Sequence, residues 1–456
     1  MNILLISVNQ QKSLYPVTPI GMASVAAFLK KNGYQVFCHD VCFETDVTDS
    51  IRKAIDVSQP DCIGISIRNI DSTAYLLPEF FLDAAKLAVE CCKSACTARL
   101  VLGGSGFSVM PVEILKYCGA DLGIAGEGES AFLEYLRAIE TGREFTDIPG
   151  LVMLKDGGFI RNKPANNQDL KEFPYPDRKL YDPEYLKYEK KTPFGTYYGV
   201  ESIQTKRGCP FQCIYCTYPL IEGTTARLKT PEHLVDELCQ IIEKQGTNRV
   251  EIVDSIFNVP AGHAEAICHE IIQRGVRVSW NCSVNPEYFS EHLAQLMRNA
   301  GCRRIDFGID TASPRMIEKY QKSFHRDSLI KASQWCKETG IELSCSLIIG
   351  GPGEDNETIR DTFETMETVN PYVCSVMLGM RIYPGTKLAQ IARDEAFIKD
   401  DQNLLHPRFY FSRDIGETGI EIMQHYQKKY PNWYFLGTRG VSVKERIKES
   451  YQREAV

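Results

Sequence analysis

The stretch Lys206-Arg-Gly-Cys-Pro-Phe-Gln-Cys-Ile-Tyr-Cys-Thr-Tyr-Pro219 places Cys209, Cys213 and Cys216 directly after a strand-like run. Thiolates are the usual ligands of iron–sulfur clusters, and a cluster that only transfers electrons normally has four of them. A set of three leaves one corner of a cubic cluster without a protein ligand. Such a cluster could bind a substrate as well as pass an electron, so the spacing indicates redox chemistry.

A zinc site and a packed structural cluster are the alternatives for these cysteines. Structural zinc takes four ligands, typically in two pairs, and the sequence has neither a second close pair nor a neighbouring Cys-His pairing. His233 follows on a predicted helix, where we expect a solvated surface position. A packed role fits poorly with Arg207, Gly208 and Pro210, which predict a polar, exposed loop. Both alternatives stay open, and the iron–sulfur site is favoured.

The length and composition describe a soluble protein of several domains. A chain of 456 residues predicts two or three domains, and 43% hydrophobic with 24% charged residues is ordinary for globular proteins. A net charge of −7 argues against the basic surface that nucleic-acid binding requires, so we expect no nucleic-acid partner. The 17 cysteines are spread without the tight spacing of a disulfide scaffold, which predicts reduced thiols.

We expect neither a secretion signal nor a transmembrane segment. The first residues form an amphipathic pattern rather than a basic region followed by a long apolar stretch, and no segment is apolar enough to span a bilayer. The expected location is therefore the cytoplasm.

Residues 1 to about 140 alternate short apolar runs with helical patterns, which predicts five βα units of a doubly wound parallel sheet. Ligands of such sheets bind beyond the carboxyl ends of the strands. The predicted strands are residues 3–8, 35–39, 62–67, 100–103 and 122–125.

Three turns at the ends of these strands cover residues 66–71, 103–108 and 126–130. Two are rich in glycine, which lets the backbone approach a large ligand closely. Tight βα turns alone would also explain the glycines, but three such turns on one rim favour ligand binding.

A second βα series follows and predicts a barrel or part-barrel of six units, with the active site at the strand carboxyl ends. The cysteine trio follows its first strand and therefore lies at that mouth. The predicted strands are residues 202–206, 249–254, 276–282, 304–309, 343–349 and 373–380. We predict domains over residues 1–144 and 201–391, a proline- and tyrosine-rich linker over 145–200, and a small α-rich extension over 392–456.

The string Cys-x-x-x-Cys-x-aromatic-Cys after the first strand of six βα units resembles the radical S-adenosylmethionine (SAM) superfamily. The resemblance implies a 4Fe-4S cluster on Cys209, Cys213 and Cys216, with SAM on the fourth iron. It also implies that one electron from the cluster cleaves SAM to a 5′-deoxyadenosyl radical. Tyr215 matches the position that lies against adenine.

Further SAM contacts are implied at the ends of later strands. Asp254 ends the second strand, where relatives contact the SAM amino group, although the usual Gly-Gly-Glu is missing here. Asp310 stands where many relatives have glutamate and is implied to hold a ribose hydroxyl, as are Ser283 and Asn285. Gly350 and Gly351 resemble the fifth-strand motif whose backbone meets adenine. Helix capping by Asp310 and a tight turn at the glycines are the alternatives.

The first module resembles the cobalamin-binding domain that precedes the radical SAM barrel in one large subfamily. The implied fold is α/β, with an N-terminal Rossmann-like cobalamin-binding domain, a partial (β/α)6 radical SAM barrel and a small C-terminal α-rich extension. The Asp-x-His-x-x-Gly signature is absent, which implies cobalamin without a histidine on cobalt. The implied cobalamin-binding residues are Ser66, Arg68, Gly103, Gly104, Ser105, Gly126, Glu127 and Gly128.

This resemblance implies a methyltransferase that acts on an unactivated carbon of a small-molecule or lipid-precursor substrate. A peptide substrate is also open, and an external electron donor such as flavodoxin or ferredoxin is expected. Three alternatives remain: a non-methylating enzyme that performs cyclisation or rearrangement, a radical SAM enzyme with an empty Rossmann-like domain, and a scaffold protein with a structural zinc.

Overall fold

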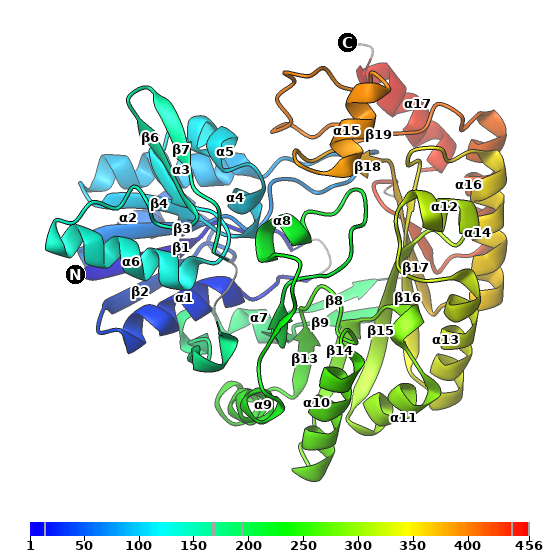
Figure 1. Ribbon diagram of the computed structural model, residues 1–456, viewed down its shortest axis with the longest axis horizontal. Helices are drawn as coiled ribbons and strands as arrows, with labels where there is room; N and C mark the ends of the chain where they lie inside the picture. Colours follow the sequence, from blue (N-terminus) through cyan, green and yellow to red (C-terminus); the bar gives the residue numbers. More distant parts are fainter. Residues whose placement is uncertain (13–14, 166–168, 193–194, 439–440, 455–456) are drawn as a thin grey trace.

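Two parallel sheets lie side by side in the computed structural model, which describes residues 1–12, 15–165, 169–192, 195–438 and 441–454 (Figure 1). The strands of each sheet alternate with helices along the chain, as the apolar runs predict. We call the part built on the first sheet the N-terminal unit and the part built on the second sheet the barrel unit.

The N-terminal unit has the strand order β2-β1-β3-β4-β5-β6-β7, and its first five strands are parallel. β1 is almost entirely apolar because helices cover both faces of such a sheet. The chain turns back between β1 and β3, which is where doubly wound sheets bind ligands. The parallel part contains β1 (Asn2–Ser7), α1 (Ile20–Lys31), β2 (Gln35–Asp40), α2 (Val47–Ser58), β3 (Cys62–Ser66), α3 (Leu82–Ala95), β4 (Arg99–Gly103), α4 (Ser105–Val109), α5 (Pro111–Cys118), β5 (Leu122–Ile124) and α6 (Gly128–Thr141).

The segment predicted to be a linker, residues 145–200, is partly a continuation of this sheet. β6 (Leu151–Lys155) pairs antiparallel with β5, and β7 (Gly158–Arg161) pairs antiparallel with β6. The linker prediction is wrong for this hairpin, because its strands are too short to show a clear period. The rest of the segment crosses to the barrel unit through η1 (Leu170–Glu172), η2 (Arg178–Leu180), α7 (Glu184–Lys187), β8 (Glu189–Thr192) and β9 (Gly195–Tyr198).

The barrel unit has the strand order β10-β13-β14-β15-β16-β17-β20, and every neighbouring pair is parallel. The six predicted strands are present as β10 (Glu201–Ile203), β13 (Arg249–Ile252), β14 (Ser279–Ser283), β15 (Cys302–Asp310), β16 (Glu342–Ile349) and β17 (Val373–Leu378). A seventh strand, β20 (Trp433–Phe435), comes from the predicted C-terminal extension. The sheet order ends at β10 and β20, so the barrel is open, and the predicted partial barrel is confirmed with one more strand.

Several helices of the barrel unit, among them α9, α11, α14 and α15, begin at a residue whose side chain caps the helix. The predicted start at Thr230 is confirmed, since its side chain accepts a hydrogen bond from the His233 N–H at 3.3 Å. The helices are α9 (Pro231–Gln245), α10 (Ala261–Gln273), α11 (Glu291–Asn299), α12 (Pro314–Lys319), α13 (Arg326–Thr339), α14 (Asn356–Val369), α15 (Lys387–Asp394), α16 (Glu417–Lys429) and α17 (Val443–Glu454). The short elements are β11 (Lys206–Arg207), α8 (Tyr218–Glu222), β12 (Arg227–Leu228), η3 (Pro286–Tyr288), β18 (Met380–Arg381) and β19 (Phe409–Tyr410).

Apolar side chains on one face of the second sheet form the main core beneath the helices, and Figure 1 shows α13, α14 and α16 on the side away from the N-terminal unit. Trp433 of β20 is buried there and stacks on Tyr426. This contact explains why the C-terminal residues join the barrel unit instead of forming a separate cap.

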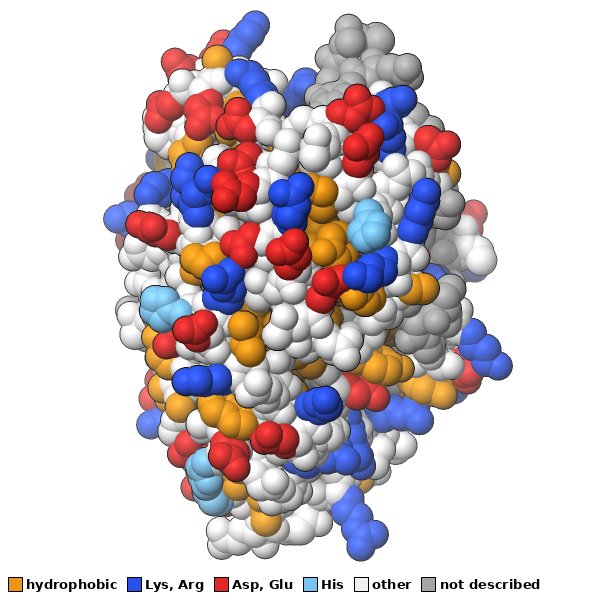
Figure 2. All heavy atoms as spheres, turned by 90° about the vertical axis from the view of Figure 1, so that its right-hand side faces the viewer, with side chains coloured by type: hydrophobic (Ala, Val, Ile, Leu, Met, Phe, Trp, Pro, Cys, Tyr) orange, Lys and Arg blue, Asp and Glu red, His pale blue; other side chains and the backbone are white. Residues whose placement is uncertain are grey.

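The surface over the outer helices has mixed charge. Figure 2 shows this face, and Lys and Arg side chains are interspersed there with Asp and Glu instead of forming one basic stripe. None of the helices in the described part of the chain combines the length and the apolar character that crossing a membrane would need.

Candidate active site

The cysteine trio lies in the loop between β11 and β12, which pair antiparallel at the carboxyl end of β10. The base of the loop is closed, because the Cys209 N–H donates to Gly223 O at 3.1 Å and the Gly208 N–H donates to Glu222 at 3.0 Å. Gly208 has φ +95, and an added Cβ there would lie 2.2 Å from Thr225 O. Only glycine fits at this position.

The three thiols are more buried than expected. Cys209 is buried, and Cys213 and Cys216 are half-buried, so the prediction of an exposed polar loop is wrong. The prediction erred because the neighbouring Arg207 side chain is covered by the N-terminal unit. Burial raises the pKa of the Cys213 thiol, and it raises the pKa of Cys216 to about 12. These thiols ionise only when a metal replaces the proton.

The placement of possible metal ligands disfavours a single-ion site. Within the described ranges, no three His, Cys, Asp or Glu side chains are grouped so that they could hold one metal ion. A structural zinc requires four such ligands around one point. An iron–sulfur cluster requires each thiolate to meet a different iron, and three thiols in one loop fit that need. His233, predicted to be solvated, instead stacks on Tyr175, with its buried Nε2 unpartnered.

Lys322, which the sequence analysis missed, lies against the trio. Its Nζ contacts Asp310 at 2.5 Å and donates to Gly308 O at 2.9 Å and to the Tyr215 hydroxyl at 3.3 Å. Burial lowers the pKa of Lys322, but Asp310 outweighs burial, so the ammonium stays charged. That charge lowers the pKa of the nearby Cys213 thiol and thus favours its thiolate. A lone lysine after a short helix gives no sequence signal for this role.

Asp310 and Tyr215, both predicted to contact SAM, are brought together. The Tyr215 hydroxyl donates a hydrogen bond to the Asp310 carboxylate, which is buried at the end of β15. Asp310 has φ +64, a left-handed conformation that costs about 1–3 kcal/mol for a residue other than glycine. The N-cap of α12 is Ser313, so helix capping does not explain Asp310.

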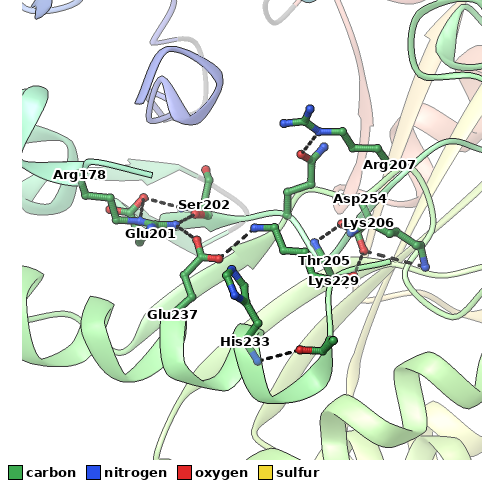
Figure 3. Close-up of polar contacts among 12 residues, drawn as sticks. Arg178, Glu201, Ser202, Thr205, Lys206, Arg207, Lys229, His233, Glu237 and Asp254 are labelled. Carbon is green, nitrogen blue, oxygen red and sulfur yellow. Dashed lines mark hydrogen bonds and ion pairs between the residues drawn. The ribbon is translucent and has the colours of Figure 1, made fainter. Parts of the chain in front are cut away.

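Asp254, predicted to contact SAM, is fully engaged by protein groups (Figure 3). Its carboxylate accepts hydrogen bonds from the Thr205 N–H at 2.7 Å and from the Thr205 hydroxyl, and it lies 4.0 Å from the Lys206 Nζ. These contacts fix the end of β10 just before the trio.

The same view shows how the linker reaches this region. Arg178 donates to Ser202 O at 2.8 Å and to Glu237 at 2.7 Å, and Lys229 pairs with Glu237 at 3.0 Å. The Lys229 N–H also donates to Thr205 O at 3.0 Å. A buried ionic network therefore positions the strand before the trio and the hairpin that carries it.

Ser283 and Asn285 lie at the end of β14 as predicted, but the Asn285 side chain is committed to neighbouring loops. Its amide donates to the Ser323 hydroxyl at 2.9 Å, and its oxygen accepts from the Glu287 N–H at 2.9 Å. Ser283 is half-buried, and its carbonyl accepts from the Phe257 N–H at 2.8 Å.

Gly350 and Gly351 end β16, and their N–H groups already have partners. Gly350 donates to Glu354 at 2.5 Å, and Gly351 donates to the Tyr320 hydroxyl at 3.0 Å. An added Cβ would lie 2.5 Å from Phe411 at Gly350 and 2.4 Å from Tyr320 at Gly351. Packing against these rings explains both glycines.

The eight residues predicted to bind cobalamin lie at the carboxyl ends of β3, β4 and β5, and every one of them is at least partly exposed. Arg68 and Ser105 are exposed, and a Cβ at Gly103 would meet only Ile124 O, at 3.6 Å. Gly104 has φ +99 and approaches Ile67 closely, which a side chain would prevent. None of the eight is histidine. This open, glycine-lined rim would fit a large flat ligand.

One of the eight, Glu127, has another partner. Its carboxylate forms a two-pronged hydrogen bond with Arg227 of β12, and the next acidic residue, Glu129, pairs with Arg207 of β11 at 2.6 Å. Two carboxylates of the N-terminal unit thus hold both strands of the hairpin that carries the trio.

The α8 helix, which follows the trio, contacts α4 of the rim. Tyr218 of α8 is 43% exposed. Cys216 of the trio and Arg68 of the rim both lie near enough to affect the pKa of its hydroxyl. The rim of the first sheet and the segment that follows the trio are therefore in contact.

Two family models match this chain. The radical SAM superfamily matches residues 203–366, and the B12 binding domain matches residues 6–136. The first range contains the trio and the barrel strands β13 to β16. The second contains all eight rim residues.

Curated relatives match most of the chain. An uncharacterized methyltransferase from Pyrococcus horikoshii, PH0819, is 29% identical over 82% of this chain and 78% of its own length. An anaerobic magnesium-protoporphyrin IX monomethyl ester cyclase from Rubrivivax gelatinosus is 26% identical over 94% of this chain and 77% of its own.

The fold is similar to that of the radical SAM methyltransferase TsrM from Kitasatospora setae. A TsrM structure with cobalamin and a [4Fe-4S] cluster is 21% identical, has a TM-score of 0.80 and covers 100% of this chain and 99% of TsrM. A second TsrM structure, with tryptophan substrate and a SAM analog, has a TM-score of 0.79 at 23% identity, over 94% of this chain and 89% of TsrM.

Proposed function

Because the chain belongs to the radical SAM enzymes that carry a B12-binding domain, we propose that it transfers a methyl group from SAM to an unactivated carbon of a small-molecule or lipid-precursor substrate. The observation that carries this proposal is the attachment of the rim to the trio hairpin through Glu127, Glu129, Arg207 and Arg227. A methyl carrier on the rim would face a radical generated at the trio.

In this proposal Cys209, Cys213 and Cys216 hold a 4Fe-4S cluster. When bound, the cluster supplies the electron that cleaves SAM, and cobalamin supplies the methyl group. The Lys322 ammonium stabilises the Cys213 thiolate, and burial of the loop excludes water that would quench a radical. The electron comes from an external donor such as flavodoxin or ferredoxin.

Asp310 and Tyr215 are the SAM-binding residues that the geometry supports best, because they lie together beside the trio. We assign a supporting role to Asp254, Asn285, Gly350 and Gly351, since protein groups already satisfy their polar atoms. Ser283 keeps its hydroxyl free for a ligand, as no described contact uses it.

On the cobalamin side, Ser66, Arg68, Gly103, Gly104, Ser105, Gly126 and Gly128 form the proposed binding rim. Glu127 instead acts as a positioning residue through its pair with Arg227.

Methyl transfer can be tested with SAM that carries a deuterated methyl group. Holoenzyme, reconstituted anaerobically with iron, sulfide and hydroxocobalamin, is incubated with reductant and a small-molecule extract of the source cells. We expect a product three mass units heavier than the one formed with unlabelled SAM. The Cys213→Ala variant is the control and should form no labelled product.

The relative named as a cyclase favours a second candidate, a cyclisation without methyl transfer. A new product that is formed with SAM cleavage but carries no deuterium would support the cyclisation and exclude methyl transfer. Failure of the reconstituted protein to retain cobalamin would instead favour an empty N-terminal unit.

Asp310→Asn is expected to weaken SAM binding by about tenfold, because a charged hydrogen-bond acceptor contributes about 1.5–3 kcal/mol. Equilibrium dialysis with labelled SAM measures this change, and the cluster absorbance should stay the same. Unchanged SAM affinity would remove the assigned role.

A further inference from the structure

The inward face of the barrel sheet carries polar side chains on each strand from β13 to β17. Along β13 to β17, residues facing the helices are buried and apolar, while those on the opposite face are partly exposed. Barrel interiors are usually filled by bulky branched side chains. Here the inward face carries Glu251, Asn281, Asp306, Ser344, Ser346 and Ser375.

Asp306 occupies the middle of this face. Its neighbours across the sheet are Ser283 on β14 and Ser344 on β16. The hydroxyl of Ser346 lies 3.2 Å from both carboxylate oxygens. These small neighbours leave the carboxylate half-buried on the inward face of the sheet.

Asp306 has no cationic partner within ion-pair distance among the described residues, unlike several carboxylates nearby. Glu129, Glu237 and Asp310 each form an ion pair of 3.0 Å or less with an arginine or lysine. In the described part of the chain, the side chain of Asp306 is hydrogen-bonded by the Ser346 hydroxyl. A half-buried carboxylate without a counter-charge is costly, and a bound cation removes that cost.

The surroundings of Asp306 add negative charge. Glu251 on β13 and Asp310 on β15 are both close enough to raise its pKa. Glu251 accepts a hydrogen bond from the Tyr15 hydroxyl at 2.7 Å and has Arg68 nearby. Tyr15 belongs to the N-terminal unit, so both units contribute to the surroundings of Asp306.

We propose that the substrate carries a basic nitrogen, protonated at neutral pH, which pairs with the Asp306 carboxylate on the inward face of the barrel. This inference rests on the proposed function only in placing the substrate between the two units. A protonated nitrogen forms charge-assisted hydrogen bonds to a carboxylate, and the serines around Asp306 accept or donate further bonds to polar groups beside it.

The binding should depend on pH in a defined direction. Burial, with Asp310 and Glu251, raises the pKa of Asp306 to about 7, although the Ser346 hydroxyl lowers it. When no cation is bound, the Asp306 carboxyl group is therefore largely protonated below pH 7. A bound cation favours the ionised carboxylate. Affinity should fall as the pH decreases from 8 to 6, and binding in that range should release protons.

Equilibrium dialysis of holoenzyme against a small-molecule extract of the source cells tests the proposal without requiring turnover. Mass spectrometry identifies the compounds that wild type retains, and these are then titrated against wild type, Asp306→Asn and Asp327→Asn. Asp327 is an exposed carboxylate on the outer helix α13 and serves as the matched control. We expect a retained compound with a basic nitrogen whose affinity falls about tenfold or more in Asp306→Asn and is unchanged in Asp327→Asn.

Four outcomes would overturn the inference. Wild type could retain only neutral or acidic compounds, or no compound at all. The Asp306→Asn variant could bind a basic compound as tightly as wild type, or it could lose affinity for SAM alone. Because the readout is binding, a failed methyl transfer in the deuterium assay would count against the proposed function and leave this result interpretable.

Discussion

Replacing any one of Cys209, Cys213 or Cys216 with alanine is expected to abolish both the brown cluster chromophore and the cleavage of SAM. The loop has only these three thiols, so it offers no fourth cysteine to replace a lost ligand. Losing one thiolate leaves two, which is too few to hold the cluster with an open iron. The visible absorbance and the rate of 5′-deoxyadenosine formation after anaerobic reconstitution measure the loss.

Cys239→Ala is the matched control for this experiment. Cys239 is half-buried on α9 and lies outside the loop, so its variant should keep the chromophore and the SAM cleavage of wild type. A brown, active protein that lacks all three loop cysteines would refute the cluster assignment.

The second large effect is expected at the contact between the two units. Glu129→Gln should lower the free energy of unfolding by about 3–5 kcal/mol, because it leaves the buried Arg207 guanidinium without its close partner. The Glu129 side chain is only 3% exposed and the Arg207 side chain 12%, so water screens the pair weakly. Glu127, 3.8 Å from Arg207, compensates for part of the loss and favours the lower end of that range. Urea denaturation followed by fluorescence measures the change.

The exposed pair of Arg304 with Glu342 provides the control. Both side chains are about one third or more exposed, at 34% and 46%, so Glu342→Gln should change the stability by no more than about 1 kcal/mol. Equal effects of Glu129→Gln and Glu342→Gln would contradict the role of the buried pair.

The Glu129 pair also sets a pH dependence. Burial alone would raise the pKa of Glu129, but Arg207 outweighs burial and holds it below its ordinary value of 4.5. The stability that the pair contributes is therefore complete above pH 4.5 and is lost as the pH falls through the lowered pKa. The Glu129→Gln variant should lose less stability than wild type over that acidic range.

Most of the architecture could be predicted from the sequence. Both βα series were visible because their strands are buried on the helix side and form apolar runs, such as residues 3–6 and 347–349. The predictions failed at β6, β7 and β20, which have three to five residues each. Such short strands form because they pair with the edge of a sheet that is already present. The local sequence contains no pattern that indicates this edge.

The residues of the candidate site show the same difference between local patterns and tertiary contacts. The cysteine spacing and the glycine turns are local patterns, and by themselves they indicated the three cluster ligands and a ligand-binding rim. Whether a polar atom is free for a ligand depends instead on neighbours that are distant in the chain. Asp254 and Asn285 were predicted to bind SAM but are held by Thr205 and Ser323, whereas Lys322 approaches Cys213 from 109 positions away in the sequence.

The cysteine trio and the order of the two βα series could thus be predicted from local patterns. The pairing of the carboxylates became visible only in the folded chain. Glu127 and Glu129 meet arginines of the other unit, while Asp306 forms no ion pair with any described residue. The physical reason is that Coulomb energy depends on distance in space and on burial, and neither quantity is encoded in the spacing of residues along the chain.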